Sequence, residues 1–554
     1  MGIKLCSKVV AIEGMVSFAE CRVQHVDDKN LDIRNVPEHL EYLGYRLEKE
    51  RLILSFKGLK PGRGRLEVEL EGRTLLIPTV VFKTREFFLS MVISSNFHYG
   101  FDPENMIRGG NDDSLRHVCG HGFKKTCRTL EPLYHKYGLP VTWLVDPEAA
   151  RDGKGEFEHF HHTFGDDYGV MPTSYFHHNS KNFNRDNTVD ETVAMLKKAI
   201  EGVEESFDYY TDIVGIDQWV GGVGKNFVKA CEILGKKGIW GLGYDHFTCD
   251  TSMFHRGCPW DMYKPDRENI KIPCSYSSDL WGFQWTTRDI INTVHTPTGA
   301  SGSVIFSTDP DDIRPTNIMQ SQRDYYTRML REYRDNMKYN DYFVFLVHQE
   351  DHEAHIEEDN LYLENFIRDV IEDVTPATLQ EIIMWLNIKY AKDEHPSQVL
   401  YLEDPLTCQE EVLWVRGDVV KPDDWASYNG KYPPHGAFYN RDYQIILKKP
   451  DRRPYRVYNY KAAYNIMETD SYPEERYPDI EIIDEKLEKQ GEAWMYTAKL
   501  YSDEECESYP LVIWDLPQGL LEEIGNSTII HTHKYILLFL TLSQGQNEIS
   551  IKLV

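Results

Sequence analysis

The chain has 554 residues, of which 61 are basic and 89 are acidic, so its net charge is −28. A chain of this length exceeds one hydrophobic core, and several domains are expected. The acidic excess argues against nucleic acid or an anionic membrane surface as a partner. Ten cysteines without a Cys-x-x-Cys pair, and no apolar stretch long enough to cross a membrane, predict a soluble, cytoplasmic protein with reduced thiols.

The first part of the chain, residues 1–86, alternates short apolar runs with turn signals. Within 51–82, the segment GLKPGRG separates two strand-like runs. This pattern predicts an N-terminal β-domain of sandwich type.

From residue 87 the pattern changes to apolar strands that alternate with amphipathic helices. The predicted strands are 87–95, 139–145, 211–216, 239–244, 303–306 and 342–347. The predicted helices are 123–137, 188–207, 227–234, 317–338, 360–373 and 378–390. This alternation predicts an α/β fold with a parallel sheet, and the number of repeats favours a (β/α)7-like barrel over residues 87–400.

After residue 400 the short strands and turns return. Segments such as KYPPHGAFYNRDYQIILKKPDRRPYRVYNY and the alternating C-terminal strand pattern predict a second β-domain of sandwich type over 401–554. The expected order is therefore a β-domain, a barrel and a second β-domain.

Polar side chains follow five of the predicted barrel strands at the same end. They are Asn96, His98, Asp102, Asp146, Asp217, Trp219, Asp245, His246, His348, Glu350 and Asp351. A loop charge or a helix N-cap would explain any one of them. Because active sites of parallel barrels lie at the carboxyl ends of the strands, five such positions in register favour a functional mouth.

The segment IVGIDQWVGGVGKNFVKACEILGKKGIWGLGYDH (213–246), within 88–375, resembles the glycoside hydrolase/deacetylase superfamily. That superfamily includes polysaccharide deacetylases and the family 57 glycoside hydrolases, both on distorted (β/α)7 barrels. The resemblance implies an oligosaccharide or glycoconjugate substrate. It also implies that the nucleophilic carboxylate of family 57 enzymes maps onto Asp217, and their general acid onto HQED (348–351).

Glycosidic cleavage needs a carboxylic acid and a second carboxylate on either side of the bond. Asp217 is the predicted nucleophile or base and Glu350 the predicted acid, with Asp351 as its rival. This hydrolase needs no cofactor. The predicted substrate-binding residues are His98, Asp146, Trp219, Asp245, His246 and His348. Trp143 and Trp240 lie in apolar runs and are expected to pack in the core.

Two alternatives remain open. The first is a divergent metal-dependent deacetylase, which would use zinc or another divalent metal. Segments 94–100 and 175–179 lack the paired aspartates and spaced histidines of such enzymes, although His98, His177 and His178 could hold a metal. The second alternative is a glycan-binding barrel without catalysis.

The histidine-rich groups in 117–127 and 158–162 have no spacing typical of a structural zinc site. We expect Cys127 to pack in a helix and residues 158–162 to lie in a long loop at the rim of the mouth.

Overall fold

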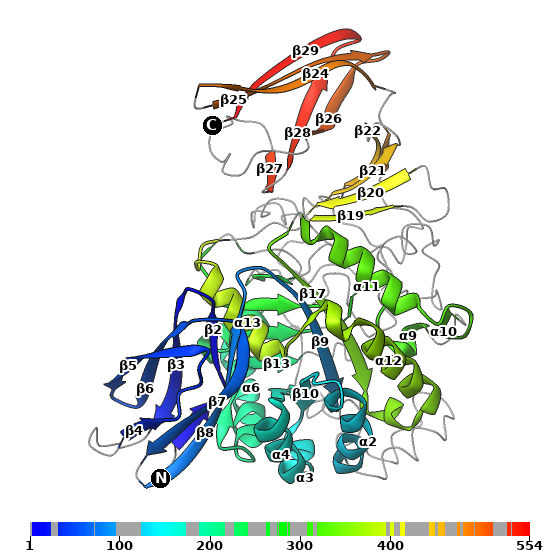
Figure 1. The fold of residues 1–554 in the computed structure, drawn as a ribbon. Coiled ribbons are helices and arrows are strands. Elements are labelled where there is room, and N and C mark those ends of the chain that lie inside the picture. Colours follow the sequence, from blue (N-terminus) through cyan, green and yellow to red (C-terminus); the bar gives the residue numbers. More distant parts are fainter. Residues whose placement is uncertain are drawn as a thin grey trace.

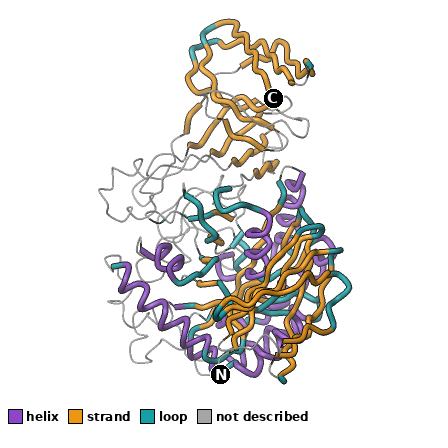
Figure 2. The backbone as a smooth tube through the Cα atoms, turned by 90° about the vertical axis from the view of Figure 1, so that its left-hand side faces the viewer, coloured by secondary structure: helices purple, strands orange, loops and turns teal. Residues whose placement is uncertain are grey.

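The computed structural model describes most of the first 394 residues and a set of C-terminal strands. The described residues are 3–23, 31–70, 72–95, 123–172, 188–215, 226–241, 262–265, 267, 274, 276–284, 286–287, 307–313, 318–338, 340–394, 399–403, 410–415, 443–448, 453–459, 474–476, 480–491, 493–513, 529–532 and 535–553. Helices surround a central sheet, and the C-terminal strands stand away from it (Figures 1 and 2). No helix in these ranges combines the length and apolar content needed to cross a membrane.

The central sheet has the strand order β15-β16-β14-β13-β11-β10-β9-β17, with β18 beside β9. Its strands are β9 (Glu86–Ser94), β10 (Val141–Val145), β11 (Asp167–Val170), β13 (Ile213–Gly215), β14 (Gly238–Trp240), β15 (Met262–Tyr263), β16 (Trp281–Phe283), β17 (Tyr342–Glu350) and β18 (Thr375–Pro376). All neighbours are parallel except β15 and β16. The predicted parallel sheet is therefore confirmed.

The sheet is nearly closed, because its edge strand β17, which pairs with β9 along nine residues, is also reached by the chain from the other edge. At the opposite edge, the chain just beyond β16 reaches β17. The backbone N–H of Thr287 donates to the carbonyl of Leu346 at 3.0 Å, and the N–H of Leu346 donates to Thr287 Oγ1 at 2.8 Å. The described strands thus form a barrel-like sheet. The complete (β/α)7 barrel with flanking sandwich domains, and the boundaries at residues 86 and 400, stay predictions.

Most predicted helices are present. They are α2 (Phe123–His135), α3 (Pro147–Asp152), α4 (Lys154–Phe164), α6 (Val189–Glu204), α7 (Asn226–Ile233), α9 (Pro310–Ile313), α10 (Ile318–Ser321), α11 (Tyr325–Asp335), α12 (Glu357–Val370) and α13 (Leu379–Lys389). Thr188 and Glu191 form the predicted capping box of α6. The prediction of one helix over 317–338 was wrong, because two helices, α10 and α11, and a 3-10 turn (Asn336–Lys338) occupy it.

The prediction that residues 158–162 form a loop at the rim was also wrong. They lie in α4, which ends at Gly165 in the left-handed conformation (φ 82°) and leads into the first residue of β11. His161 is buried at this amino end of the sheet, where its Nδ1 lies 2.7 Å from the carbonyl oxygen of Asp166. The buried residues of α4, which are Phe157, Phe160 and His161, therefore pack in the core.

The interior of the barrel-like sheet is filled by apolar side chains that alternate along the strands. Val92, Leu144, Ile213, Trp240, Trp281, Phe283, Val344 and Leu346 belong to one buried cluster. Residues Ile382, Ile383, Trp385 and Leu386 of α13 join the same cluster. Helix α13 therefore packs against the amino end of the sheet, and Trp240 packs in the core as predicted.

The N-terminal strands form two sheets, ordered β12-β1-β3-β6-β5 and β2-β8-β7-β4. Their strands are β1 (Ile3–Cys6), β2 (Val9–Ile12), β3 (Val16–Val23), β4 (Leu31–Arg34), β5 (Leu40–Glu48), β6 (Arg51–Gly58), β7 (Gly62–Leu70), β8 (Arg73–Phe82) and β12 (Tyr209–Tyr210). Both sheets contribute side chains to one buried cluster. Strand β12 comes from a later part of the chain, so its parallel pairing with β1 joins the N-terminal strands to the central unit.

An ion cluster, buried except for the side chain of Arg63, lies where these N-terminal strands meet α13. Lys8 Nζ lies 2.9 Å from Asp167 Oδ2 and 2.8 Å from Glu381 Oε1. Arg63 Nη1 lies 2.7 Å from the same Glu381 oxygen. Burial raises the pKa of Asp167 to about 6 although Lys8 opposes this. Burial would also raise the pKa of Glu381, but Arg63 and Lys8 lower it to about 2. We call Lys8, Arg63, Asp167 and Glu381 the seam cluster.

The C-terminal part of the described chain contains three antiparallel sheets, in agreement with the strand content predicted for 401–554. Their orders are β19-β20-β21-β22-β23, β24-β25-β29 and β26-β28-β27. The strands are β19 (Val399–Glu403), β20 (Glu410–Val415), β21 (Tyr443–Lys448), β22 (Arg453–Asn459), β23 (Glu474–Arg476), β24 (Ile480–Gln490), β25 (Ala493–Ser502), β26 (Cys506–Ile513), β27 (Ile529–Thr532), β28 (Tyr535–Leu542) and β29 (Gly545–Leu553).

Candidate functional site

The carboxyl ends of the parallel strands meet on one side of the central sheet. Strand β9 ends at Ser94, β10 ends next to Asp146, and β17 ends at Glu350, which is the register partner of Ser94. We call this side the mouth. Polar residues on this side of the described part of the chain include Ser94, Ser95, Asp146, Asp309, His348, Glu350 and Asp351.

Strand β17 extends further than its apolar run predicts. It continues through His348, Gln349 and Glu350, so these residues belong to the strand itself. Because side chains alternate along a strand, His348 and Glu350 share the inner face with Leu346. The ring of His348 contacts the interior Trp240, with 4.9 Å between the ring centroids. Gln349 faces the helices, where it accepts a hydrogen bond from the Tyr134 hydroxyl.

The central feature of the mouth is a hydrogen-bonded chain of Ser94, His348 and Asp309. His348 Nδ1 lies 2.7 Å from Asp309 Oδ2, and His348 Nε2 lies 2.8 Å from Ser94 Oγ. All three residues are buried. An ionised carboxylate can only accept a hydrogen bond, so it assigns the ring proton to Nδ1. In the neutral ring Nε2 is then unprotonated, and it accepts the hydroxyl proton of Ser94.

Ser94, His348 and Asp309 have the arrangement that makes serine nucleophilic in acyl-transfer hydrolases. There, histidine takes the hydroxyl proton, and a buried carboxylate holds the ring in the correct tautomer and stabilises the imidazolium that forms. The triad is recognised by geometry and roles, not by the order of its residues in the chain. The mouth therefore has the groups needed for general base catalysis.

The short segment that carries Asp309 is held tightly against β17. The N–H of Asp309 donates to Ser307 Oγ at 3.0 Å, and the N–H of Thr308 donates to the carbonyl of Thr287 at 3.0 Å. The Thr308 hydroxyl donates to the carbonyl of Leu346. These bonds fix Asp309 beside His348, so the carboxylate stands on a rigid support.

Sequence reasoning missed Ser94 and Asp309. Both positions carried a usable signal, because Ser94 is the next-to-last residue of the first predicted strand and Asp309 follows the predicted strand 303–306 by three residues. The predicted strand 303–306 was not among the five strands whose following residues were predicted to face the mouth. That strand itself lies outside the described residues.

Glu350 and Asp351, the predicted acid and its rival, are both buried at the mouth. The N–H of Glu350 donates to Glu353 Oε2 at 3.0 Å, so Glu350 begins the 3-10 turn Asp351–His355. The structure thus brings Glu350 and Asp351 to the same end of β17 as His348. Their predicted catalytic role stays a prediction.

Asp146, a predicted substrate-binding residue, caps helix α3. Its Oδ1 accepts hydrogen bonds from the N–H groups of Glu148 at 2.9 Å and Ala149 at 2.7 Å. The N–H of Asp146 donates to Ser95 Oγ at 3.3 Å, which links the ends of β10 and β9. Capping alone explains an aspartate here, and substrate binding by Asp146 stays a prediction.

The other predicted site residues lie outside the described residues. They are His98, His177, His178, Asp217, Trp219, Asp245 and His246. No group of three or more His, Cys, Asp or Glu side chains that could hold a metal occurs within the described ranges. The zinc site of the deacetylase alternative therefore has no ligand set there, and its three candidate histidines stay a prediction.

No protein-family model matches the chain. No curated protein matches it either. The structure is similar to a "putative polysaccharide deacetylase from Mycobacterium smegmatis" at 13% identity, covering 54% of this chain and 90% of that one, with a TM-score of 0.34. It is also similar to a "probable Polysaccharide deacetylase from Pseudomonas aeruginosa PAO1" at 12% identity, covering 55% of this chain and 93% of that one, with a TM-score of 0.37.

A "putative alpha-galactosidase (BF1418) from Bacteroides fragilis NCTC 9343" is similar at 9% identity, covering 75% of this chain and 86% of that one, with a TM-score of 0.25. At TM-scores this low, function has to be argued from the chain's own residues.

Proposed function

We propose that this chain is a carbohydrate-active hydrolase, and that it removes acyl groups from a glycan at the mouth of the barrel-like sheet. The observation that carries this proposal is the chain of hydrogen bonds from Ser94 through His348 to Asp309. The carbohydrate class rests on the resemblance of residues 213–246 to the glycoside hydrolase/deacetylase superfamily.

In this reaction Ser94 Oγ attacks the carbonyl carbon of the acyl group while His348 Nε2 takes the hydroxyl proton. Asp309 stabilises the positive charge on the imidazolium. The C–O or C–N bond to the sugar then breaks, and His348 returns the proton to the departing sugar oxygen or nitrogen. Water, deprotonated by His348, hydrolyses the acyl-serine and regenerates Ser94.

Glycosidic cleavage is the second candidate function. It is favoured by two buried carboxylates, Glu350 and Asp351, beside His348 at the mouth. Asp217 would supply the second carboxylate across the scissile bond, as the sequence predicts. On this candidate Glu350 is the proton donor, and no covalent intermediate forms on Ser94.

One experiment separates the candidates. The purified chain is incubated with acetylated and unacetylated oligosaccharides, and free acetate and new reducing ends are measured for wild type, Ser94→Ala, His348→Gln and Glu350→Gln. Deacylation predicts acetate release that Ser94→Ala and His348→Gln abolish. Cleavage predicts new reducing ends that Glu350→Gln abolishes while Ser94→Ala retains them. Glycan binding without either product by the wild-type chain would support the non-catalytic alternative and overturn the proposal.

A further inference from the structure

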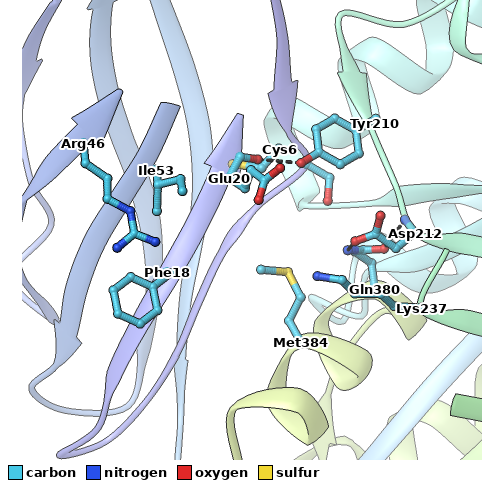
Figure 3. A pocket seen from close by; sticks show the side chains of 11 residues that line it. Cys6, Phe18, Glu20, Arg46, Ile53, Tyr210, Asp212, Lys237, Gln380 and Met384 are labelled. Carbon is cyan, nitrogen blue, oxygen red and sulfur yellow. Dashed lines mark hydrogen bonds between the residues drawn. The ribbon is translucent and has the colours of Figure 1, made fainter. Parts of the chain in front are cut away.

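A cavity of about 240 Å³ lies between the N-terminal strands and the amino end of the central unit, on the side away from the mouth. Phe18, on β3, lines one wall and Met384, on α13, lines the other (Figure 3). Cys6 lines the cavity next to Tyr210, its register partner on β12. Cys6 is itself a buried residue of the core, so it lies between the cavity and the interior.

Cys6 has a second thiol directly beside it. Its Sγ lies 3.4 Å from the Sγ of Cys21 on β3, and its backbone N–H donates to the Cys21 sulfur, also at 3.4 Å. A disulfide bond is about 2.0 Å long, so the two sulfur atoms need to approach from 3.4 Å by about 1.4 Å. Both cysteines are free thiols in this structure, and both are buried.

We propose that Cys6 and Cys21 form an oxidation site, at which a peroxide that enters the cavity converts the two thiols to a disulfide. Hydrogen peroxide is close to water in size, so the cavity admits it. Cys127 and Cys231 are also buried thiols, but each packs in a helix within the core and neither lines this cavity.

The reaction has two steps that balance. The Cys6 thiolate attacks one oxygen of hydrogen peroxide, the O–O bond breaks, and the departing hydroxide takes the thiol proton as water, which leaves a sulfenic acid on Cys6. The Cys21 sulfur then attacks the Cys6 sulfur, the S–O bond breaks, and the second oxygen leaves as water with the Cys21 proton. Two thiols and one peroxide thus give one disulfide and two waters.

The immediate surroundings favour Cys21 as the attacking group in the second step. The hydrogen bond between the two thiols lowers the pKa of Cys21 and, together with burial, raises that of Cys6. A thiolate on Cys21 is therefore accessible at lower pH than one on Cys6. The first step uses the Cys6 thiolate, whose population grows with pH, so we expect oxidation to accelerate as the pH rises.

The disulfide would form at the junction between the N-terminal strands and the central unit. Strand β1 pairs with β3 on one side and with β12 on the other. The Tyr210 hydroxyl also donates to the carbonyl of Glu20 on β3 at 2.6 Å. A covalent link from β1 to β3 would stiffen this three-strand junction, and we expect a higher melting temperature for the oxidised chain.

The full chain is treated with hydrogen peroxide at several pH values, free thiols are blocked, and peptides are mapped by mass spectrometry. The expected result is a cross-linked peptide pair containing Cys6 and Cys21, lighter by two hydrogen atoms, which forms faster at higher pH and disappears on reduction. Cys6→Ser and Cys21→Ser should each abolish it, and Met384→Trp, which fills the cavity, should slow it.

Several outcomes would overturn the proposal. In one, the wild-type chain keeps both thiols free under peroxide that oxidises exposed methionines. In another, Cys127 and Cys231 react as fast as Cys6. In a third, oxidation in Met384→Trp is as fast as in the wild type. The first two outcomes are measured on the wild-type chain, so they do not depend on whether a variant folds.

Discussion

The imidazole of His348 lies 2.7 Å from the carboxylate of Asp309, a residue that precedes it by 39 positions. Strand β17 supplies the histidine, and a short segment bound to that strand through Thr308 supplies the carboxylate. This pair gives a geometric reason for a histidine on the inner face of β17, directly after the apolar positions Val344 and Leu346.

The substitution Asp309→Asn tests the pair at the mouth. An asparagine amide can donate to Nδ1 of His348, which would move the ring proton to Nε2 and remove the acceptor for Ser94. We expect kcat to fall by about 10²- to 10⁴-fold at neutral pH, by comparison with the same change in serine hydrolases. Initial rates of acetate release across the pH range measure this. Asp335→Asn, on the exposed side of α11, is the matched control and should keep full activity; equal rates in both variants would contradict the assignment.

The seam cluster predicts a large effect of Lys8→Met on stability. Lys8 is 1% exposed and is the shared partner of Asp167 and Glu381. Its loss leaves Asp167 without a cation in the interior, so the free energy of unfolding should fall by about 3 to 5 kcal/mol. Urea unfolding measures the change. Lys60→Met, which breaks the exposed pair with Glu38, should change it little, and similar losses in the two variants would contradict a special role of the seam cluster.

His161 predicts how stability depends on pH. Burial, with Lys8 nearby, lowers the pKa of His161 from 6.5 to about 3. Between these two values the unfolded chain binds a proton that the folded chain does not, so His161 stabilises the fold above pH 6.5 and this contribution is lost as the pH falls toward 3. Asp167 acts in the opposite direction, because the contribution of its raised pKa is complete below pH 3.8 and is lost as the pH rises to about 6.

The contribution of His161 is isolated by comparing the wild type with His161→Gln. The variant loses the ring stacking on Tyr209 and should be less stable at neutral pH. Its free energy of unfolding should also fall less steeply as the pH is lowered from 6.5 to 4.5. Urea unfolding at a series of pH values gives both slopes, and parallel slopes would show that His161 is not the group responsible.

The contact of α13 with the central sheet predicts the effect of Gly238→Ala. A Cβ at this position would overlap the Cδ1 of Ile383 on α13, and overpacking of this kind costs about 1 to 3 kcal/mol. The double variant with Ile383→Val removes the closer of two overlapping atoms, the other being Cδ1 of Ile213, and should recover part of that loss. Gly155→Ala is the matched control, because a Cβ added there points into open space on the exposed side of α4. This substitution should raise the free energy of unfolding by at most about 1 kcal/mol. Thermal unfolding compares them, and failure of the double variant to improve on Gly238→Ala would contradict this packing.

Much of the central fold was predictable because its strands and helices follow simple periodic patterns. The run Tyr342 to Val347 is buried on both faces, as its apolar sequence indicates. The capping box at Thr188 and the buried face of α2 were readable for the same reason. Residues 158–162 were misassigned because histidines weakened the helical pattern there, and the helix is held instead by packing of Phe157 and Phe160.

The site was only partly predictable, since its geometry depends on contacts between distant segments. His348 and Glu350 were found from their position after an apolar run. Ser94 and Asp309 were not, because a single serine at a strand end and a single aspartate in the sequence STDP have many ordinary uses. Only the fold brings these two residues to the two nitrogens of one imidazole.

The most direct test of the proposed function is the release of acetate from an acetylated oligosaccharide by the purified wild-type chain and by His348→Gln. We predict release by the wild type and a loss of that release in His348→Gln, with both proteins giving the same melting temperature within a few degrees. Acetate release that is equal in the two proteins, or no release by a correctly folded wild type on any acetylated glycan, would contradict the assignment of His348 as the group that transfers the proton.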